Sequence, residues 1–153
     1  MTIRSARVED IPQISELLSE FFAYNAKQQP NNYIATSENG NYPSSVSDSD
    51  KGVFFIAETG KTIIGLLHIE EGSTPPYPSI VPHKFACIID FFVKPYYRKK
   101  NVGRLLLEEA KAWAQSRNLE YIELMVLENN ETGKRFYEGT DFITTSRTMR
   151  LDF

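Results

Sequence analysis

Apolar and polar residues alternate at the start of the chain and then change to the spacing of a helix. Residues 2–7 alternate and predict a strand. From Ile11 to Phe22 the apolar residues recur every three or four positions, which predicts an amphipathic helix of about four turns. Asp10 precedes this helix, and Pro12 lies in its first turn, where a missing N–H group costs nothing.

Beyond this helix the periodicity disappears and then returns as strands. Residues 28–52 are rich in Pro, Asn, Ser, Gly and Asp, and we expect a long functional or mobile loop there. Residues 53–58 and 62–70 predict two strands joined by a tight turn into a hairpin. Residues 72–83 contain four prolines, which predict a second long connection because proline cannot pair within a sheet.

Strands and helices alternate in the second half of the chain. Residues 84–93 are almost entirely apolar, which is typical of a strand covered on both faces, and Pro95 ends the run. A helix is predicted over residues 102–117. Its apolar stripe comprises Val102, Leu105, Leu106, Ala110 and Trp113. A strand over 120–126, a helix over 131–138 and a last strand over 142–151 follow. The order β-α-(loop)-β-β-β-α-β-α-β predicts an α/β fold in a single domain over residues 1–153, with a mixed central sheet flanked by helices.

Composition narrows the range of functions. The net charge is −3 and the sequence pI is near 5.5, which argues against non-specific binding to nucleic acid. No apolar run is long enough to span a membrane, and the first residues do not resemble a secretory signal. A single cysteine, Cys87, cannot form an internal disulfide. We therefore expect a cytoplasmic protein without membrane or nucleic-acid partners.

The connection between the run 84–93 and the next helix concentrates positive charge. It contains Arg98, Lys99, Lys100 and Arg104, and Asn101 and Gly103 lie among them. One interpretation is a solvated, charged loop. The other is an anion site, because the free N–H groups and the positive dipole of a helix start attract phosphate. Gly103 would let the backbone approach a ligand closely, and Asn101 tolerates a left-handed conformation.

The stretch FFVKPYYRKKNVGRLLLEEA resembles motif A of the GCN5-related N-acetyltransferases, with Arg98 at the leading position and Gly103 at the final one. Asn101 stands where the family has its middle glycine. A second motif follows from Asn130 through Phe136 and Tyr137 to Phe142. Two of its positions differ from the family pattern, and they are occupied by Gly133 and Asp141. The resemblance extends over nearly the whole chain, and it implies the fold of this family.

The resemblance also implies acetyl-CoA as acyl donor and no metal. Phe91, Phe92 and Val93 would hold the pantetheine arm, and an N–H group near Phe92 or Val93 would polarise the thioester carbonyl. Asn130 would either bind amide or phosphopantetheine groups of the cofactor or cap the helix that follows it. The residues implied to hold the pyrophosphate are Arg98, Lys99, Lys100, Asn101, Val102, Gly103 and Arg104.

Two residues are candidates for proton transfer. Tyr137 matches the general acid of the family and would protonate the leaving thiolate; the alternative is a tyrosine of the core. Asp90 interrupts an apolar run and could deprotonate the attacking amine; a structural hydrogen bond or ion pair is equally compatible. Glu123 is a weaker candidate for the base. His68 and His83 are isolated in the sequence, so no metal site is predicted.

The acceptor is less well specified than the donor. We expect residues 28–52 and 72–83 to flank the acceptor end of the cofactor, where aromatic and acidic side chains suit a cationic amine. The candidates are Tyr24, Tyr33, Tyr42, Tyr77, Glu38, Asp48 and Asp50, which could equally be ordinary loop residues. A small-molecule amine is the expected substrate. The alternatives are a protein lysine or N-terminus, or an acyl-CoA-binding module without transferase activity. Family members often form dimers, so the resemblance is compatible with a homodimer, which nothing in the sequence decides.

Overall fold

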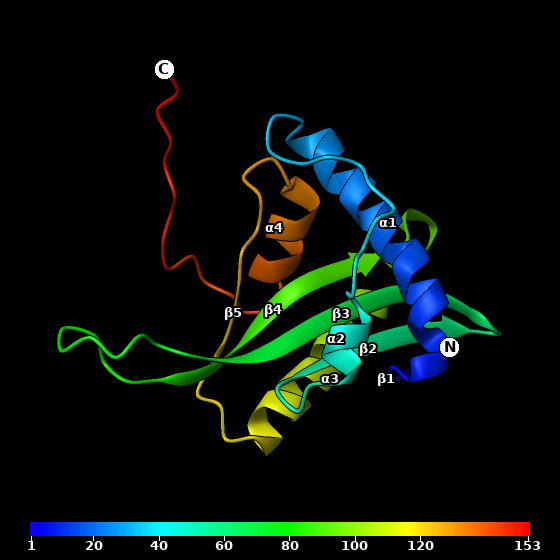
Figure 1. Ribbon diagram of the computed structural model, residues 1–153, viewed down its shortest axis with the longest axis horizontal. Helices are drawn as coiled ribbons and strands as arrows, with labels where there is room; N and C mark the ends of the chain where they lie inside the picture. The colour runs from blue at the N-terminus through cyan, green and yellow to red at the C-terminus, as the bar shows by residue number, and fades with distance from the viewer.

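A five-stranded sheet forms the centre of the molecule in the computed structural model, which describes residues 1–153 (Figure 1). Its strands lie in the order β1-β2-β3-β4-β5, and only the last pair, β4 and β5, is parallel. The strands are β1 (Thr2–Ser5), β2 (Gly52–Thr59), β3 (Thr62–Ser73), β4 (Lys84–Val93) and β5 (Ile122–Leu124). The sheet therefore combines an antiparallel meander with one parallel strand, as the predicted mixed sheet requires.

Two long helices cover opposite faces of this sheet (Figure 1). Helix α1 (Ile11–Gln28) packs on one face and continues beyond the predicted four turns, and α3 (Val102–Ser116) packs on the other. The shorter helices are α2 (Ser44–Ser47), within the first predicted loop, and α4 (Glu131–Glu138). No helix has both the length and the apolar character needed to cross a bilayer.

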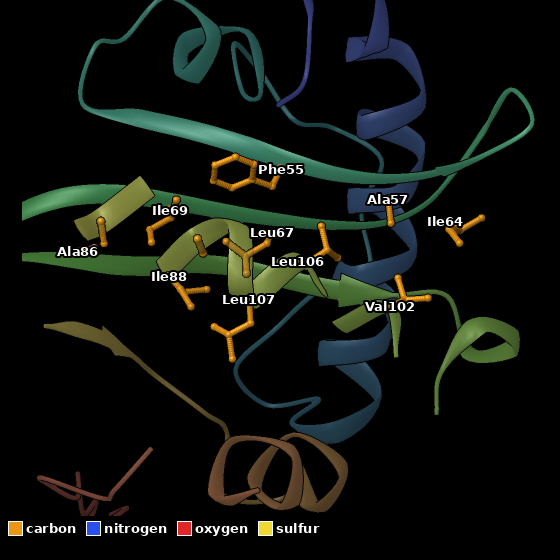
Figure 2. Packing of buried hydrophobic residues seen from close by; sticks show 12 residues of the cluster. Phe55, Ala57, Ile64, Leu67, Ile69, Ala86, Ile88, Val102, Leu106 and Leu107 are labelled. Atoms are coloured by element: carbon orange, nitrogen blue, oxygen red, sulfur yellow. The ribbon is translucent and has the colours of Figure 1, made fainter. Parts of the chain in front are cut away.

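The two faces of the sheet give two apolar clusters. Figure 2 shows the cluster on the α3 side, where Phe55, Leu67 and Ile88 of the sheet meet side chains of the helix. The α1 side is filled by residues such as Leu18, Leu66 and Phe92. Adjacent residues of a strand supply opposite clusters because their side chains alternate across the sheet. The apolar run of β4 thus has the two-sided coverage that its sequence predicts.

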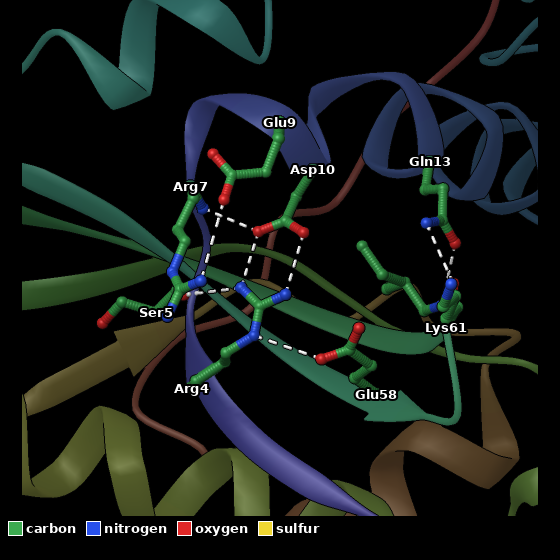
Figure 3. A network of polar contacts seen from close by, with 9 residues as sticks. Arg4, Ser5, Arg7, Glu9, Asp10, Gln13, Glu58 and Lys61 are labelled. Atoms are coloured by element: carbon green, nitrogen blue, oxygen red, sulfur yellow. Dashed lines mark hydrogen bonds and ion pairs between the residues drawn. The ribbon is translucent and has the colours of Figure 1, made fainter.

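A polar network closes the edge of the sheet where the chain enters α1 (Figure 3). The Arg4 guanidinium donates to both oxygens of the buried Asp10 carboxylate, at 2.6 and 2.9 Å, and contacts Glu58 at 3.2 Å. The hydrogen bonds from Arg4, together with one from the Arg7 N–H, hold the pKa of Asp10 below its ordinary value. Asp10 therefore remains charged and joins β1 to the start of α1.

Three predictions about elements were wrong. No strand forms over residues 142–151, which make no ladder with the sheet. The predicted strand 120–126 shortens to β5, because the chain leaves β4 soon after Leu124. In α3, Leu105 is 36% exposed and Leu107 is buried instead. A helix presents neighbouring positions 100° apart, so a stripe assigned one step too early selects the wrong leucine.

Candidate active site

A β-bulge in β4 decides which side chains face which helix. His68 pairs with Asp90 and Ile69 pairs with Ile88, so Ile89 has no partner on β3. The extra residue reverses the alternation beyond it: Ala86 and Ile88 face α3, whereas Phe92 faces α1. Asp90 shares the α1 side with Phe92 because it is two residues away. Without the bulge, the acid would lie in the cluster beneath α3.

The far half of β4 has a free edge. Strand β5 pairs only with residues Ala86 to Ile88, and beyond them the two strands separate. The Lys94 N–H donates to Ile64 O of β3, and alternation places the Phe92 N–H on that side too. The backbone groups of Phe91 and Val93 therefore point to the free edge. Of the two N–H groups expected to polarise a thioester, only that of Val93 is available.

The start of α3 presents a row of unused donors. The N–H groups from Lys99 to Arg104 make no hydrogen bond within the chain. Asn101 precedes the helix with φ 66°, and Lys99 has φ 58°. These left-handed residues curve the backbone, so that its N–H groups converge on one concave surface. Asn101 thus adopts the conformation predicted for it, and the N–H groups and the helix dipole together favour an anion.

The basic side chains of this loop have different surroundings. Arg98 Nε donates to Val93 O at 2.9 Å, and the guanidinium stacks on Tyr24 at 4.7 Å from the ring centre. Arg98 thereby joins the loop to β4 and α1. Lys100 Nζ lies 3.9 Å from the centre of the Tyr96 ring, and Arg104 reaches Gly139 O at 3.4 Å. Lys99 is exposed to solvent. The backbone thus supplies more unoccupied donors than the side chains do.

Helix α4 packs against the start of α3 at Gly103, and a second glycine, Gly133, lies in the first turn of α4 itself. A methyl group at Gly103 would come within 3.3 Å of the Phe136 ring, so glycine lets α4 approach α3 closely. At Gly133, where the family has alanine, a methyl group would lie 2.5 Å from the Asn130 side chain. Asn130 Oδ1 accepts from the Gly133 N–H at 2.9 Å, so the capping role left open for Asn130 is present.

Tyr137 projects from α4 toward β4. Its ring lies among aromatic neighbours, 6.3 Å from the Phe91 centroid and 5.6 Å from that of Phe142. This burial raises the pKa of Tyr137 above its ordinary value. Its hydroxyl makes no hydrogen bond within the chain, so the group is a protonated donor without a partner. Phe91 faces α3, so the neighbouring Tyr137 ring lies on the α3 side of the sheet. The Asp90 side chain lies on the α1 side.

Asp90 lies in a polar cluster that the sequence did not predict. The Tyr42 hydroxyl donates to Asp90 Oδ2 and lies 2.6 Å from His68 Nδ1. His68 is buried and stacks on Phe54, and its Nε2 lies 3.1 Å from Glu70 Oε1 without a hydrogen bond. Burial and the nearby charge of Asp90 raise the pKa of Tyr42, so its hydroxyl stays protonated. Asp90 Oδ1 has no partner within the chain.

Only one of the two irregular segments reaches this cluster. Tyr42 belongs to residues 28–52, and its hydrogen bond brings that loop to the site. The connection 74–83 follows the opposite end of β3, and Lys84 lies six residues before Asp90 along β4. At about 3.3 Å per residue the separation is about 20 Å. The expectation that both segments flank the acceptor end of the cofactor was therefore wrong. Tyr77 lies away from the cluster around Asp90.

An open cleft of about 740 Å³ adjoins Phe92. Helix α1 lines it with Glu20 and Tyr24, and Pro95 closes the side next to the basic loop. Glu20 is paired with Lys94 at 2.9 Å. The cleft thus combines an aromatic surface with one acidic and one basic side chain, Glu20 and Lys27, and Phe92 places it on the α1 side of β4.

The chain matches the Acetyltransferase (GNAT) family over residues 11–142. It belongs to this family. The resemblance to this family is therefore confirmed, and with it the expected fold and the expectation of an acyltransferase enzyme.

Three similar proteins match along nearly the whole chain. A tetramutant of the BH1408 protein from Bacillus halodurans is 25% identical, with a TM-score of 0.91 over 100% of both chains. An uncharacterized N-acetyltransferase from Archaeoglobus fulgidus is 26% identical over 92% of each chain. The aminoglycoside N-acetyltransferase AAC(6')-Iy, solved in complex with CoA, is 14% identical with a TM-score of 0.76 over 99% of this chain and 98% of that one. At this identity the likeness concerns the fold alone.

Proposed function

We propose that the protein transfers an acetyl group from acetyl-CoA to a primary amine of a small molecule, by direct attack of the amine. The observation that carries this proposal is the continuity of two donor surfaces. The free edge of β4 at Phe91 and Val93 leads into the row of unused N–H groups from Lys99 to Arg104. A strand-like arm that ends in a pyrophosphate needs these two surfaces in this order.

Residues of the chain account for each demand of the cosubstrate. The loop N–H groups suit the pyrophosphate, with Lys99, Lys100, Val102 and Gly103 around them. The Phe91 and Val93 backbone suits the amides of the pantetheine arm, and the Val93 N–H suits an oxygen that gains negative charge. Asn130 keeps its side-chain NH₂ group as a donor, since the cap uses only its carbonyl oxygen. Acetyl-CoA supplies the activated thioester when it is bound, and no metal is needed for these roles.

Proton transfer is assigned to two residues. Tyr137 protonates the leaving sulfur, because its raised pKa keeps the hydroxyl protonated throughout the working range. Asp90 accepts the proton of the ammonium group, directly or through water, with its free Oδ1 while Tyr42 holds Oδ2. The cleft beside Phe92 has a volume typical of sites for small molecules. AAC(6')-Iy, which shares the fold, has also been solved in complex with the bisubstrate analogue CoA-S-monomethyl-acetylneamine.

A release assay for free thiol tests the proposal. The protein is mixed with acetyl-CoA and a panel of small primary amines, beside lysine peptides as protein-like acceptors. Small amines should release thiol, and Tyr137→Phe should lower kcat at least about 100-fold without weakening acetyl-CoA binding. Binding of acetyl-CoA without release for any acceptor would indicate a non-catalytic acyl-CoA-binding module. Release with peptides alone would indicate a protein acetyltransferase, and no response to acetyl-CoA would refute the proposal.

A further inference from the structure

His68 is a buried polar side chain to which the proposed chemistry gives no role. It lies on β3, is only 1% exposed, and stacks on Phe54 with 4.6 Å between the ring centres. Phe54 and Leu66, on the same side of the sheet, belong to the apolar cluster beneath α1. A polar group in such surroundings destabilises the fold unless it is hydrogen-bonded. The two ring nitrogens of His68 therefore need partners.

The two nitrogens of this ring differ in their partners. Nδ1 lies 2.6 Å from the Tyr42 hydroxyl oxygen. Nε2 lies 3.1 Å from Glu70 Oε1 but forms no hydrogen bond with it, and the nitrogen is shielded from solvent. A neutral imidazole carries one proton. On Nδ1 that proton has an acceptor, whereas on Nε2 it would be buried without one, so the hydrogen-bond network assigns it to Nδ1.

This assignment fixes the direction in which the Tyr42 hydroxyl donates. The hydroxyl has one proton and two neighbours that could accept it, His68 Nδ1 and Asp90 Oδ2. When Nδ1 carries its own proton, it donates to the Tyr42 oxygen, and the Tyr42 proton goes to Asp90. If the His68 proton were on Nε2, the hydroxyl could turn to Nδ1, and Asp90 Oδ2 would lose its donor.

The sheet holds the three side chains in this arrangement. His68 and Asp90 are direct partners across β3 and β4, so their side chains lie next to each other on the α1 side. His68 Nδ1 and Asp90 Oδ2 are 3.7 Å apart, which is too far for a hydrogen bond, and the Tyr42 hydroxyl bridges them. Glu70 is the other charged group beside the ring, on its Nε2 side.

We propose that His68 is a positioning residue for the acceptor half of the reaction. Its Nδ1–H group holds the Tyr42 hydroxyl so that the hydroxyl donates to Asp90 Oδ2, which leaves Oδ1 to take the ammonium proton. His68 is buried and acts only through Tyr42. This role rests on the proposed function, since it requires Asp90 to be the base, whereas the hydrogen bonds themselves do not.

A double-mutant cycle tests whether His68 acts through Tyr42. His68→Gln should lower kcat/KM for the amine about tenfold, because the glutamine amide lies one bond too far along the side chain to replace Nδ1. In a Tyr42→Phe background the same change should add less than about twofold, since the hydroxyl is already absent. The KM for acetyl-CoA should not change. A loss of the same factor in both backgrounds would overturn the proposal, because His68 would then act independently of Tyr42.

Two further variants separate the Nδ1–H group from the ring. In His68→Asn the amide is one bond beyond Cγ, as Nδ1 is, so it can still donate to Tyr42, and kcat/KM should stay within about threefold of the wild type. Equal losses in the asparagine and glutamine variants would contradict the proposal, because the missing ring would then be the cause. His83→Gln is the matched control: His83 also lies beside a carboxylate, 2.6 Å from Glu120, but near the opposite end of β4, and its loss should leave the rate unchanged.

A measurement without substrates tests the hydrogen bonds directly. The chain has two histidines, so in the His83→Gln protein His68 carries the single imidazole. With isotopically labelled histidine, NMR should show a proton bound to Nδ1. An Nδ1 without a proton would overturn the positioning role even in an active enzyme. If the wild type acetylates no amine, the proposed function fails and the role of His68 in it fails too, whatever the ring nitrogens show.

Discussion

The two ends of the proposed reaction are built in different ways. At the donor end, the unused N–H groups come from consecutive residues, Lys99 to Arg104, and the backbone supplies them. At the acceptor end, Asp90, Tyr42 and His68 come from three separate segments, and hydrogen bonds between their side chains hold them together. This difference indicates which substitutions should affect binding and catalysis. A site made of backbone tolerates changes of side chain, as at Asn101, whereas a site made of side chains depends on each of them.

Apart from the loss of the acid at Tyr137, the largest effect should come from the acceptor end. Asp90→Asn should lower kcat/KM for the amine about 100-fold near neutral pH, because a positioned base is lost while the side chain keeps its shape. The loss should narrow as the pH approaches about 10, where an alkyl amine is already deprotonated. Steady-state kinetics across pH measure both. Glu123→Gln is the matched control and should stay near the wild-type rate. A variant that unfolds more easily but keeps its rate would assign Asp90 a structural role only.

Tyr42→Phe should have a smaller effect at the same end. The ring keeps its packing on Phe54, but the hydrogen bond that holds Asp90 is lost. Loss of such a hydrogen bond to a charged group should lower kcat/KM for the amine about tenfold. The KM for acetyl-CoA should not change, because Tyr42 lies away from the donor loop. An effect on both substrates alike would mean that the two ends are not separable.

In the loop that begins α3, only a change that moves the backbone should matter. Gly103→Val pushes against Phe136, which a methyl group would already approach to 3.3 Å. We expect acetyl-CoA to bind about fivefold more weakly, because overpacking displaces the first turn of α3. Gly103→Ala is the graded control and should fall between the variant and the wild type. Calorimetric titration measures the affinity, and unchanged binding in the valine variant would remove Gly103 from the site.

The smallest effect should follow from removing a side chain of the donor loop. Asn101→Ala should lower the free energy of unfolding by about 1 kcal/mol, because alanine is strained at a left-handed φ. The affinity for acetyl-CoA should change less than about threefold, since the N–H groups remain. Asn101→Gly should match the wild type in both. Loss of binding in the glycine variant would show that the Asn101 side chain itself holds the ligand.

Local features could be predicted because their causes are local. The periodicity of α1 and α3, the hairpin of β2 and β3, and the extent of β4 follow from neighbouring residues. The donor loop followed from its charge and its place before a helix. The bulge at Ile89 could not be predicted. The run IIDFF has apolar residues at four of its five positions, so it fits the sheet in either register. That bulge places Asp90 on the side of Tyr42.

By itself, the sequence determined the order of the five strands and of α1, α3 and α4, the family and the loop that begins α3. Each depends on residues close together in the chain, where spacing alone sets the geometry. The tertiary structure decided the acceptor end, because hydrogen bonds among Tyr42, His68 and Asp90 join positions that no local spacing relates. It also decided that residues 142–151 form no strand in one chain. The segment has the alternation of a strand, but a strand requires a neighbour, and residues 142–151 pair with none of the five strands.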